Sequence, residues 1–259
     1  MGVLNVTPDS FSDGGIFLDP AVAERQAMKM EREGAHIIDV GGESSRPGSK
    51  PVSAREEIRR IKPVLKRLVK KVKIPISVDT YKYEVALSAL DEGARIINDI
   101  YALGADKRLG KLIARYKAGV VLMHMQGNPQ TMQAQPRYRC LLKDVAGYLK
   151  KAVDLALEAG IPRSSIAIDP GFGFGKTTEQ NLEILSHLEY FLKLRSPILV
   201  GLSRKSFIGS ILGAPVNGRL YGSLGAAAVA ITHGAHILRV HDVAEHKQLA
   251  TLVDRALWK

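Results

Sequence analysis

Cysteine is almost absent from this 259-residue chain, and its absence limits how the fold can be stabilised. A single residue, Cys140, excludes an internal disulfide. A chain of this length can instead bury a large apolar core without disulfides or metals. A low cysteine content is typical of a reducing compartment, so we expect a cytoplasmic protein in which Cys140 is structural or incidental.

Long apolar runs are also absent. The longest, residues 226–231, is far shorter than the roughly 20 residues that a membrane-spanning helix needs. Residues 1–15 lead into a polar, glycine-containing loop, without the basic and then apolar pattern of a signal peptide. We therefore expect no membrane association.

Acidic residues are scarcer than basic ones, which gives a formal net charge of +11. An anionic substrate or a nucleic acid would explain this excess. Much of the excess lies between Arg59 and Lys73, where apolar residues recur at helical spacing, so the lysines should form the solvent face of a helix. No recognised nucleic-acid motif accompanies them, and we expect no nucleic-acid partner. The apolar positions are Ile58, Ile61, Leu65, Leu68 and Val72.

Eight short apolar segments alternate with helical patterns along the whole chain. They are continuously apolar, as expected for strands buried on both faces of a parallel sheet. The predicted strands are residues 3–6, 36–40, 74–78, 95–100, 120–124, 166–169, 198–202 and 237–240.

Local signals predict where the intervening helices begin and end. Asp19 followed by Pro20 predicts a helix start, and Ser53 with Glu56 predicts a capping box. Pro63 should kink the second helix, although the apolar periodicity continues on both sides of it. Helix ends are expected at four glycines, Gly34, Gly93, Gly119 and Gly160.

No linker, low-complexity tract or shift in composition marks a domain boundary. Eight βα units in about 250 residues favour a closed barrel over an open doubly wound sheet. We therefore expect residues 1–259 to form one α/β domain, a single (β/α)8 TIM barrel with its active site at the carboxyl ends of the strands.

Polar side chains gather where the predicted strands end. These ends share one rim in a barrel, so the pattern favours one common site over separate helix caps, except at Asp99, where we favour a cap. The residues, in chain order, are Asn5, Asp39, Asp79, Asn98, Asp99, His124, Asp169, Ser203, Arg204, Lys205, Arg239 and His241.

The types of these residues narrow the class of ligand. Carboxylates and an asparagine in an apolar throat suit a planar heterocycle with several N–H donors, because a buried carboxylate needs paired donors. Asn5 and the basic residues Lys205, Arg239 and His241 would hold a carbonyl and a phosphate group at the mouth. No Ser-His-Asp or Cys-His arrangement is apparent in the motifs.

Three glycine-containing loops follow predicted strands. Residues 7–15 and 41–48 each carry one large side chain, Phe11 or Arg46, which favours mobile covers over plain connections. Residues 171–176 are similar to a phosphate-binding loop, but that pattern alone is weak. We interpret Phe172 and Phe174 in this loop as pocket walls or as packing at the top of the barrel.

Several motifs, in this order, resemble those of the dihydropteroate synthase family. Residues 2–15 and 38–48 resemble its two loop motifs, and the likeness covers essentially the whole chain. Further matches lie at residues 77–80, 97–99, 122–127, 169–176, 201–206 and 239–242.

The resemblance implies a TIM barrel, usually a homodimer, that uses Mg²⁺ in folate biosynthesis. Such an enzyme condenses a dihydropterin pyrophosphate, the 6-hydroxymethyl-7,8-dihydro compound, with p-aminobenzoate in an SN1-like substitution that releases pyrophosphate. Asp169 would pair with the aminopyrimidine edge, Lys205 would reach the ring carbonyl, and Arg239 would stack on the pterin.

By the same resemblance, each ligand group would have its own set of residues. The pterin would contact Asp79, Asn98, Met123, Asp169, Phe174, Gly201, Lys205 and Arg239. The pyrophosphate would contact Asn5, Arg239 and His241, with Asn5 helping to place Mg²⁺. The p-aminobenzoate, or a sulfonamide, would contact Phe11, Ser45, Arg46, Pro47, Lys205 and Ser206. The catalytic residues would be Asp79, Lys205, Asp39, Phe11 and Arg46.

Two features depart from the family pattern. Ser45 stands where threonine is usual, so contacts to p-aminobenzoate or sulfonamides should differ slightly. The chain also begins almost within the first strand, so we expect either a barrel floor that is less well plugged or a sequence that has been trimmed.

Three other functions share some of these features. A pterin-dependent methyltransferase barrel of a corrinoid system would share the pocket, but the loop motifs argue against it, as does the lack of a cobalamin domain. A catalytically silent pterin-binding protein would be expected to lose the loop anchors or the residues that hold the leaving group, which are present. Nucleic-acid binding is supported only by the net charge.

Overall fold

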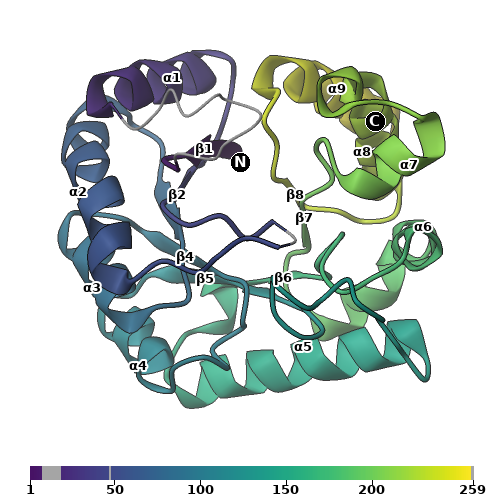
Figure 1. The fold of residues 1–259 in the computed structure, drawn as a ribbon, viewed down its shortest axis with the longest axis horizontal. Helices are drawn as coiled ribbons and strands as arrows, with labels where there is room; N and C mark the ends of the chain where they lie inside the picture. Colours follow the sequence, from purple (N-terminus) through teal and green to yellow (C-terminus); the bar gives the residue numbers. More distant parts are fainter. Residues whose placement is uncertain (8–18, 47, 258–259) are drawn as a thin grey trace.

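Eight parallel strands form the centre of the molecule in the computed structural model, which describes residues 1–7, 19–46 and 48–257 (Figure 1). All eight predicted strands are confirmed, with ends that differ by up to a few residues. They are β1 (Gly2–Asn5), β2 (Ile38–Gly41), β3 (Ile76–Asp79), β4 (Ile96–Asp99), β5 (Gly119–Met123), β6 (Ile166–Asp169), β7 (Leu199–Val200) and β8 (Ile237–Leu238).

Backbone pairing closes these strands into a barrel in chain order. Strands β1–β6 form one parallel sheet, and β7 pairs with β8. Two parallel bridges join the sheets at both seams, one between Ile168 and Ile198 and one between Gly2 and Val240. The predicted closed (β/α)8 barrel is therefore confirmed, and the carboxyl ends of all strands lie at one rim.

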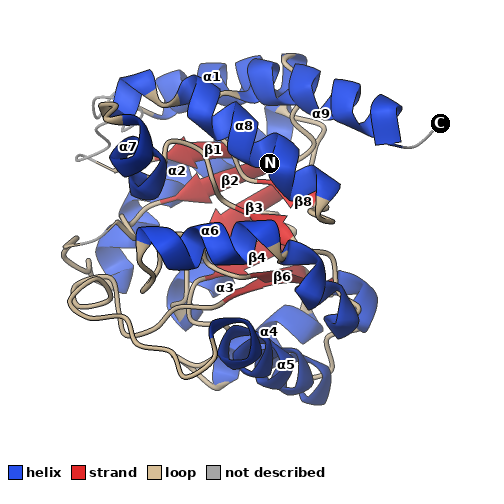
Figure 2. Ribbon diagram, turned by 90° about the vertical axis from the view of Figure 1, so that its right-hand side faces the viewer, coloured by secondary structure: helices blue, strands red, loops and turns tan. Residues whose placement is uncertain are grey.

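Helices surround this barrel on its outer side, as two perpendicular views show (Figures 1 and 2). The α-helices are α1 (Pro20–Arg32), α2 (Ala54–Lys71), α3 (Tyr83–Asp91), α4 (Arg108–Arg115), α5 (Leu141–Glu158), α6 (Thr178–Ser186), α7 (Ser206–Leu212), α8 (Leu220–Thr232) and α9 (Val243–Leu257). Short 3-10 helices are η2 (Arg163–Ser165), η3 (Leu188–Leu194) and η4 (Val216–Gly218). No helix in the described ranges is long and apolar enough to cross a membrane.

Helix starts follow the predicted caps in part. The Asp19 carboxylate accepts a hydrogen bond from the backbone N–H of Ala21, with Pro20 at the first helical position. Ser53 accepts from the N–H of Glu56 at 3.2 Å, but the Glu56 carboxylate binds Arg59 and Arg60 instead of completing a capping box.

Helix ends follow three of the four predicted glycines. Gly34, Gly93 and Gly160 follow α1, α3 and α5 with positive φ angles. The prediction for Gly119 is wrong, because Gly119 is the first residue of β5 and Lys117, with φ 51°, provides the left-handed turn after α4.

The apolar stripe of α2 packs on the barrel as predicted. Ile61, Leu65 and Leu68 are fully buried, whereas Lys66 and Lys70 are exposed on the opposite face. The helix continues through Pro63. A second, smaller apolar cluster, formed by Ile100, Met123, Met125 and Met132, packs against Phe174 and two tyrosines near the rim.

Candidate active site

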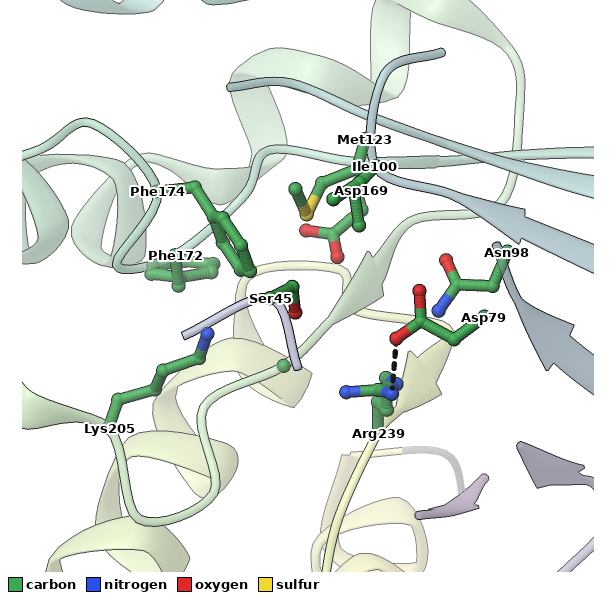
Figure 3. A pocket seen from close by; sticks show the side chains of 11 residues that line it. Ser45, Asp79, Asn98, Ile100, Met123, Asp169, Phe172, Phe174, Lys205 and Arg239 are labelled. Atoms are coloured by element: carbon green, nitrogen blue, oxygen red, sulfur yellow. Dashed lines mark hydrogen bonds and ion pairs between the residues drawn. The ribbon is translucent and has the colours of Figure 1, made fainter. Parts of the chain in front are cut away.

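The rim of the barrel encloses two connected spaces, which we call the outer cavity and the inner pocket. The outer cavity has a volume of about 580 Å³ and is lined at its mouth by Asn5, Arg46 and His241, among other residues. The inner pocket lies among the side chains shown in Figure 3 and shares Asp79 and Lys205 with the outer cavity.

All eight residues predicted to bind the pterin line the inner pocket. They come from six different strands or the loops that follow them, so only closure of the barrel brings them together. The eight are Asp79, Asn98, Met123, Asp169, Phe174, Gly201, Lys205 and Arg239, and Ser45, Ile100 and Phe172 complete the wall.

Strand register places the polar groups of the inner pocket. Asp79 ends β3 and pairs in register with Asn98 of β4, so their side chains lie next to each other. Asp169 ends β6, and its carboxylate points into the same space from another side (Figure 3). Lys205 enters from the opposite wall, with its Nζ 4.3 Å from the centroid of the Phe174 ring.

Arg239 is held by two carboxylates. Its Nη2 donates to Asp79 Oδ2 at 2.9 Å, and its Nε donates to Asp39 Oδ2 at 2.7 Å. Asp39 Oδ2 also accepts from Asn98 Nδ2 at 3.2 Å. Asp39 is fully buried and lies outside the linings of both spaces, where it contacts Arg239 and Asn98.

Two strand-end residues of the predicted site face elsewhere. His124 is buried next to Tyr148, with ring centroids 5.0 Å apart, and does not line the described cavity. Asp99 accepts hydrogen bonds from the backbone N–H groups of Tyr101 and Leu103 and so closes the turn after β4; the predicted cap of the following helix is wrong, because α4 begins only at Arg108, after Lys107.

The residues predicted for the leaving group and for p-aminobenzoate line the outer cavity where they are described. Asn5, Arg239 and His241 form one part of the wall, and the other part comprises Ser45, Arg46, Lys205 and Ser206. Phe11 and Pro47 lie outside the described residues.

A partly buried ion cluster holds the loop that carries Ser45 and Arg46. Glu43 at its start receives ion pairs and hydrogen bonds from Lys82 and Tyr81, and it accepts the backbone N–H of Val52 at its end. Lys82 also binds Glu57 of α2 at 2.6 Å. The carboxylate of Glu43 therefore connects the two ends of residues 43–52.

The glycine-rich segment 171–176 is a wall and does not cradle a phosphate. Its N–H groups at Gly171 and Gly173 are taken by Asp169 Oδ1 and Asn181 Oδ1, each at 2.7 Å. Gly171 has φ 73°, and a Cβ there would lie 1.9 Å from the carbonyl oxygen of His124, so only glycine fits. Phe172 and Phe174 wall the inner pocket, as interpreted from the sequence.

Burial dominates the ionisation of this site. It raises the pKa of Asp79 to about 7 against the opposing charge of Arg239, and it raises the pKa of Asp169. It lowers the pKa of Lys205 to about 8 and that of His241 to about 3. His241 is therefore a neutral imidazole before an anion binds, with Nδ1 lying 3.1 Å from Ser203 Oγ.

Comparison with known proteins identifies the family to which this chain belongs. The model of the pterin binding enzyme family matches residues 1–241. A dihydropteroate synthase of Synechocystis is 45% identical over 260 residues, covering 100% of this chain and 90% of the relative. The chain belongs to the dihydropteroate synthase family.

Solved structures of dihydropteroate synthases share the same fold. The enzyme of Yersinia pestis, in complex with a sulfonamide drug, superposes with a TM-score of 0.96 at 41% identity, covering 99% of this chain and 93% of that chain. The enzyme of Xanthomonas albilineans with 4-aminobenzoic acid gives a TM-score of 0.92 at 41% identity, covering 100% and 93%. Family membership makes this chain a dihydropteroate synthase of folate biosynthesis rather than a corrinoid-dependent methyltransferase.

The dihydropteroate synthase cavity also contains residues that the sequence did not indicate. Pro215, Val216, Asn217 and Arg219 line the outer cavity from the segment between α7 and α8. This segment follows no strand and carries no motif, so it offered no signal. Arg219 Nη1 donates to the carbonyl of Arg204 at 3.1 Å, which ties the segment to the loop that carries Lys205.

The donor set of this site suits Mg²⁺ only together with a substrate. No group of three or more His, Cys, Asp or Glu side chains that could hold a metal occurs among the described residues. Mg²⁺ is commonly held by one or two protein oxygens plus substrate phosphates. The amide oxygen of Asn5 in the outer cavity fits that pattern.

Proposed function

We propose that this chain condenses 6-hydroxymethyl-7,8-dihydropterin pyrophosphate with p-aminobenzoate, using the residues of the two connected spaces. The observation that carries this proposal is that the eight residues predicted for the pterin line one pocket. The sulfonamide and the 4-aminobenzoic acid bound by its relatives support an arylamine subsite beside that pocket.

The inner pocket suits a pterin in shape and charge. The Asp169 carboxylate would accept from the ring N–H and the exocyclic amino group, because an ionised carboxylate offers two acceptor oxygens. Lys205 would donate to the ring carbonyl from the opposite wall. Met123, Phe172 and Phe174 supply apolar surface for the ring faces.

The reaction is a substitution at the pterin methylene. We infer that the C–O bond breaks first, its electron pair leaves with the pyrophosphate, and the cation is delocalised into the ring. The Asp79 carboxylate, which lines the inner pocket, would stabilise that cation. The aniline nitrogen then forms the new C–N bond and loses a proton. Arg46 and Ser206 would orient the p-aminobenzoate, and Phe11 and Pro47 belong to the same proposed subsite.

The pyrophosphate would bind at Asn5, Arg239 and His241. The Nε2 side of the neutral His241 ring would donate to a phosphate oxygen, since Nδ1 faces Ser203. Mg²⁺ would be held by Asn5 together with the substrate, and when bound it neutralises charge on the leaving group.

We also propose that the protein is a cytoplasmic homodimer with residues 1–259 as one domain. Large apolar side chains are exposed on the neighbouring helices α7, α8 and α9, including Leu212, Tyr221 and Leu252 at 55%, 83% and 73% exposure. An apolar patch of this kind supports a second copy as its partner.

The decisive experiment is release of pyrophosphate by the purified protein. We expect release that depends on both the pterin pyrophosphate and p-aminobenzoate, and that falls when Mg²⁺ is chelated. Release without p-aminobenzoate would indicate a hydrolase, and no release with both substrates would contradict the proposal. Binding of the pterin pyrophosphate by an Asn5→Ala variant, with and without Mg²⁺, tests the metal site separately.

A further inference from the structure

A second buried lysine lies behind the inner pocket. Lys176 ends the glycine-rich segment 171–176 and is only 2% exposed. Its Nζ contacts three acceptors: the carbonyl oxygen of Gly171 at 2.9 Å, that of Phe174 at 3.0 Å, and His124 Nδ1 at 3.0 Å. An ammonium group has three N–H donors, so this socket satisfies it completely.

One residue, Gly171, connects Lys176 to the pterin pocket. The carbonyl of Gly171 accepts from Lys176, and the N–H of Gly171 donates to Asp169 Oδ1 at 2.7 Å. The carbonyl of Phe174, a wall of the pocket, is held by the same ammonium group. Lys176 itself does not line the described cavity.

Three cationic side chains favour the ionised form of Asp169, and they differ in their other contacts. Arg239 is bound to Asp39 and Asp79, and Lys205 faces the cavity, where a ligand would engage it. Lys176 is the third, fixed on the protein side of Asp169. His124, which also contacts Lys176, is kept neutral because burial lowers its pKa to about 2.

We propose that Lys176 is a positioning residue for pterin binding, whose charge keeps the Asp169 carboxyl group ionised while its three hydrogen bonds fix the wall that carries Phe174. This inference rests on the proposed function, because a pterin edge with two donors needs an ionised partner. A protonated Asp169 would present a donor to those donors and lose one hydrogen bond.

Lys176 carries its charge in the pH range in which Asp169 would otherwise become protonated. Burial lowers the pKa of Lys176 to about 7, although the Asp169 charge opposes this. Lys176 is therefore charged in the acid range, where Asp169, whose pKa burial raises, is at risk of protonation. Loss of the ammonium group should move protonation of Asp169 to higher pH.

The test is the pH dependence of binding of 6-hydroxymethylpterin, followed by its fluorescence between about pH 4 and pH 8. In Lys176→Met we expect the acid limb of binding to move up by about one pH unit, which weakens binding about tenfold on that limb. Asn181→Leu is the matched control, because it removes the bond to the Gly173 N–H at 2.7 Å but leaves the charge. It should weaken binding without moving the limb.

Two results would overturn the inference. Lys176→Met could bind with the affinity and pH dependence of the parent protein, or it could match Asn181→Leu with an unmoved limb, which would leave Lys176 a purely structural role. A parent protein that does not bind 6-hydroxymethylpterin at any pH would instead contradict the proposed function.

A second measurement covers the case in which Lys176→Met does not fold. By linkage, a ligand that fixes Asp169 as an anion must raise the pKa of the lysine facing it. In the ¹⁵N-lysine-labelled parent protein, we expect 6-hydroxymethylpterin to shift the Nζ signal of Lys176 toward its protonated position at about pH 7. A signal that does not move at saturating ligand would contradict the inference.

Discussion

The position and the charge of Lys205 suggest a role in turnover, and substitution of this single residue can distinguish that role from an effect on general stability. It lines both spaces, and burial lowers the pKa of its ammonium group to about 8, so it is still mainly charged at neutral pH. We expect Lys205→Ala to lower kcat by at least about 100-fold, because a charged donor to the ring carbonyl is lost. Lys66→Ala, on the exposed face of α2, is the control and should turn over normally. A Lys205→Ala protein with near-normal velocity at saturating substrates would rule out this role.

The ionisation of Asp79 should control the acid side of the pH profile. Its pKa is raised to about 7 by burial, while Arg239 limits the rise. Below that pH the carboxyl group is protonated and neutral, so it cannot stabilise a developing cation. We expect kcat/KM for the pterin substrate to fall about tenfold per pH unit below about pH 7. In Asp79→Asn the rate should be low throughout and the fall that begins near pH 7 should disappear, which leaves only the fall due to protonation of Asp169; a fall that still begins near pH 7 would assign it to another group.

At the scale of elements, the turn after β6 depends on one glycine. Gly171→Ala would place a Cβ 1.9 Å from the carbonyl oxygen of His124 at a φ of 73°. We expect the free energy of unfolding in urea to fall by more than about 3 kcal/mol, or the protein to be insoluble. Gly147→Ala in α5 is the matched control, since nothing lies within 4 Å of its added Cβ. That change should stabilise the protein by about 0.5–1 kcal/mol.

Substitution of Lys82, which anchors the 43–52 loop, should lower the stability of the protein and raise the KM for one substrate. Lys82→Met leaves two carboxylates, Glu43 and Glu57, without their cation, and Glu57 is only 1% exposed. We expect unfolding to become easier by about 3 kcal/mol. The KM for p-aminobenzoate should rise more than that for the pterin, because Ser45 and Arg46 lie on this loop.

The control for that change is another lysine ion pair. Lys62→Met removes an ion pair with Glu92 whose lysine is 43% exposed, and it should cost at most about 1 kcal/mol. Equal effects of the two substitutions on stability and on both KM values would show that Lys82 does not anchor the loop.

At the scale of the whole molecule, the exposed apolar residues of α7–α9 predict self-association. Tyr221→Glu places a charge near the start of α8 at Tyr221, which is 83% exposed. We expect the parent protein to sediment as a dimer and the variant to sediment as a monomer, because burying an unpaired charge is unfavourable. Leu155→Glu, on the distant helix α5, should not change the sedimentation. A monomeric parent protein would contradict the proposed homodimer.

Apolar patterns predicted the strands more accurately than capping signals predicted where the helices begin and end. The continuous apolar runs gave all eight strands, because strands buried on both faces must be apolar throughout. Glycine commonly follows a helix end, so the pattern predicts that role for Gly119, but Lys117 adopts the left-handed conformation there instead. The reciprocal capping box at Thr177 and Gln180 has the Thr-x-x-Gln pattern that marks a helix start.

The sequence alone determined the number of strands, the closed barrel and a polar rim, because apolar periodicity and unit count depend on the chain itself. Only the tertiary structure decided which polar residues share the site. Asp39 pairs in register with Ser77, two residues below the layer of Gly41 and Asp79, so it lies beneath the pocket. Met123 faces the pocket, and His124, the next residue, points the other way to meet Lys176, because successive side chains of a strand alternate between its faces.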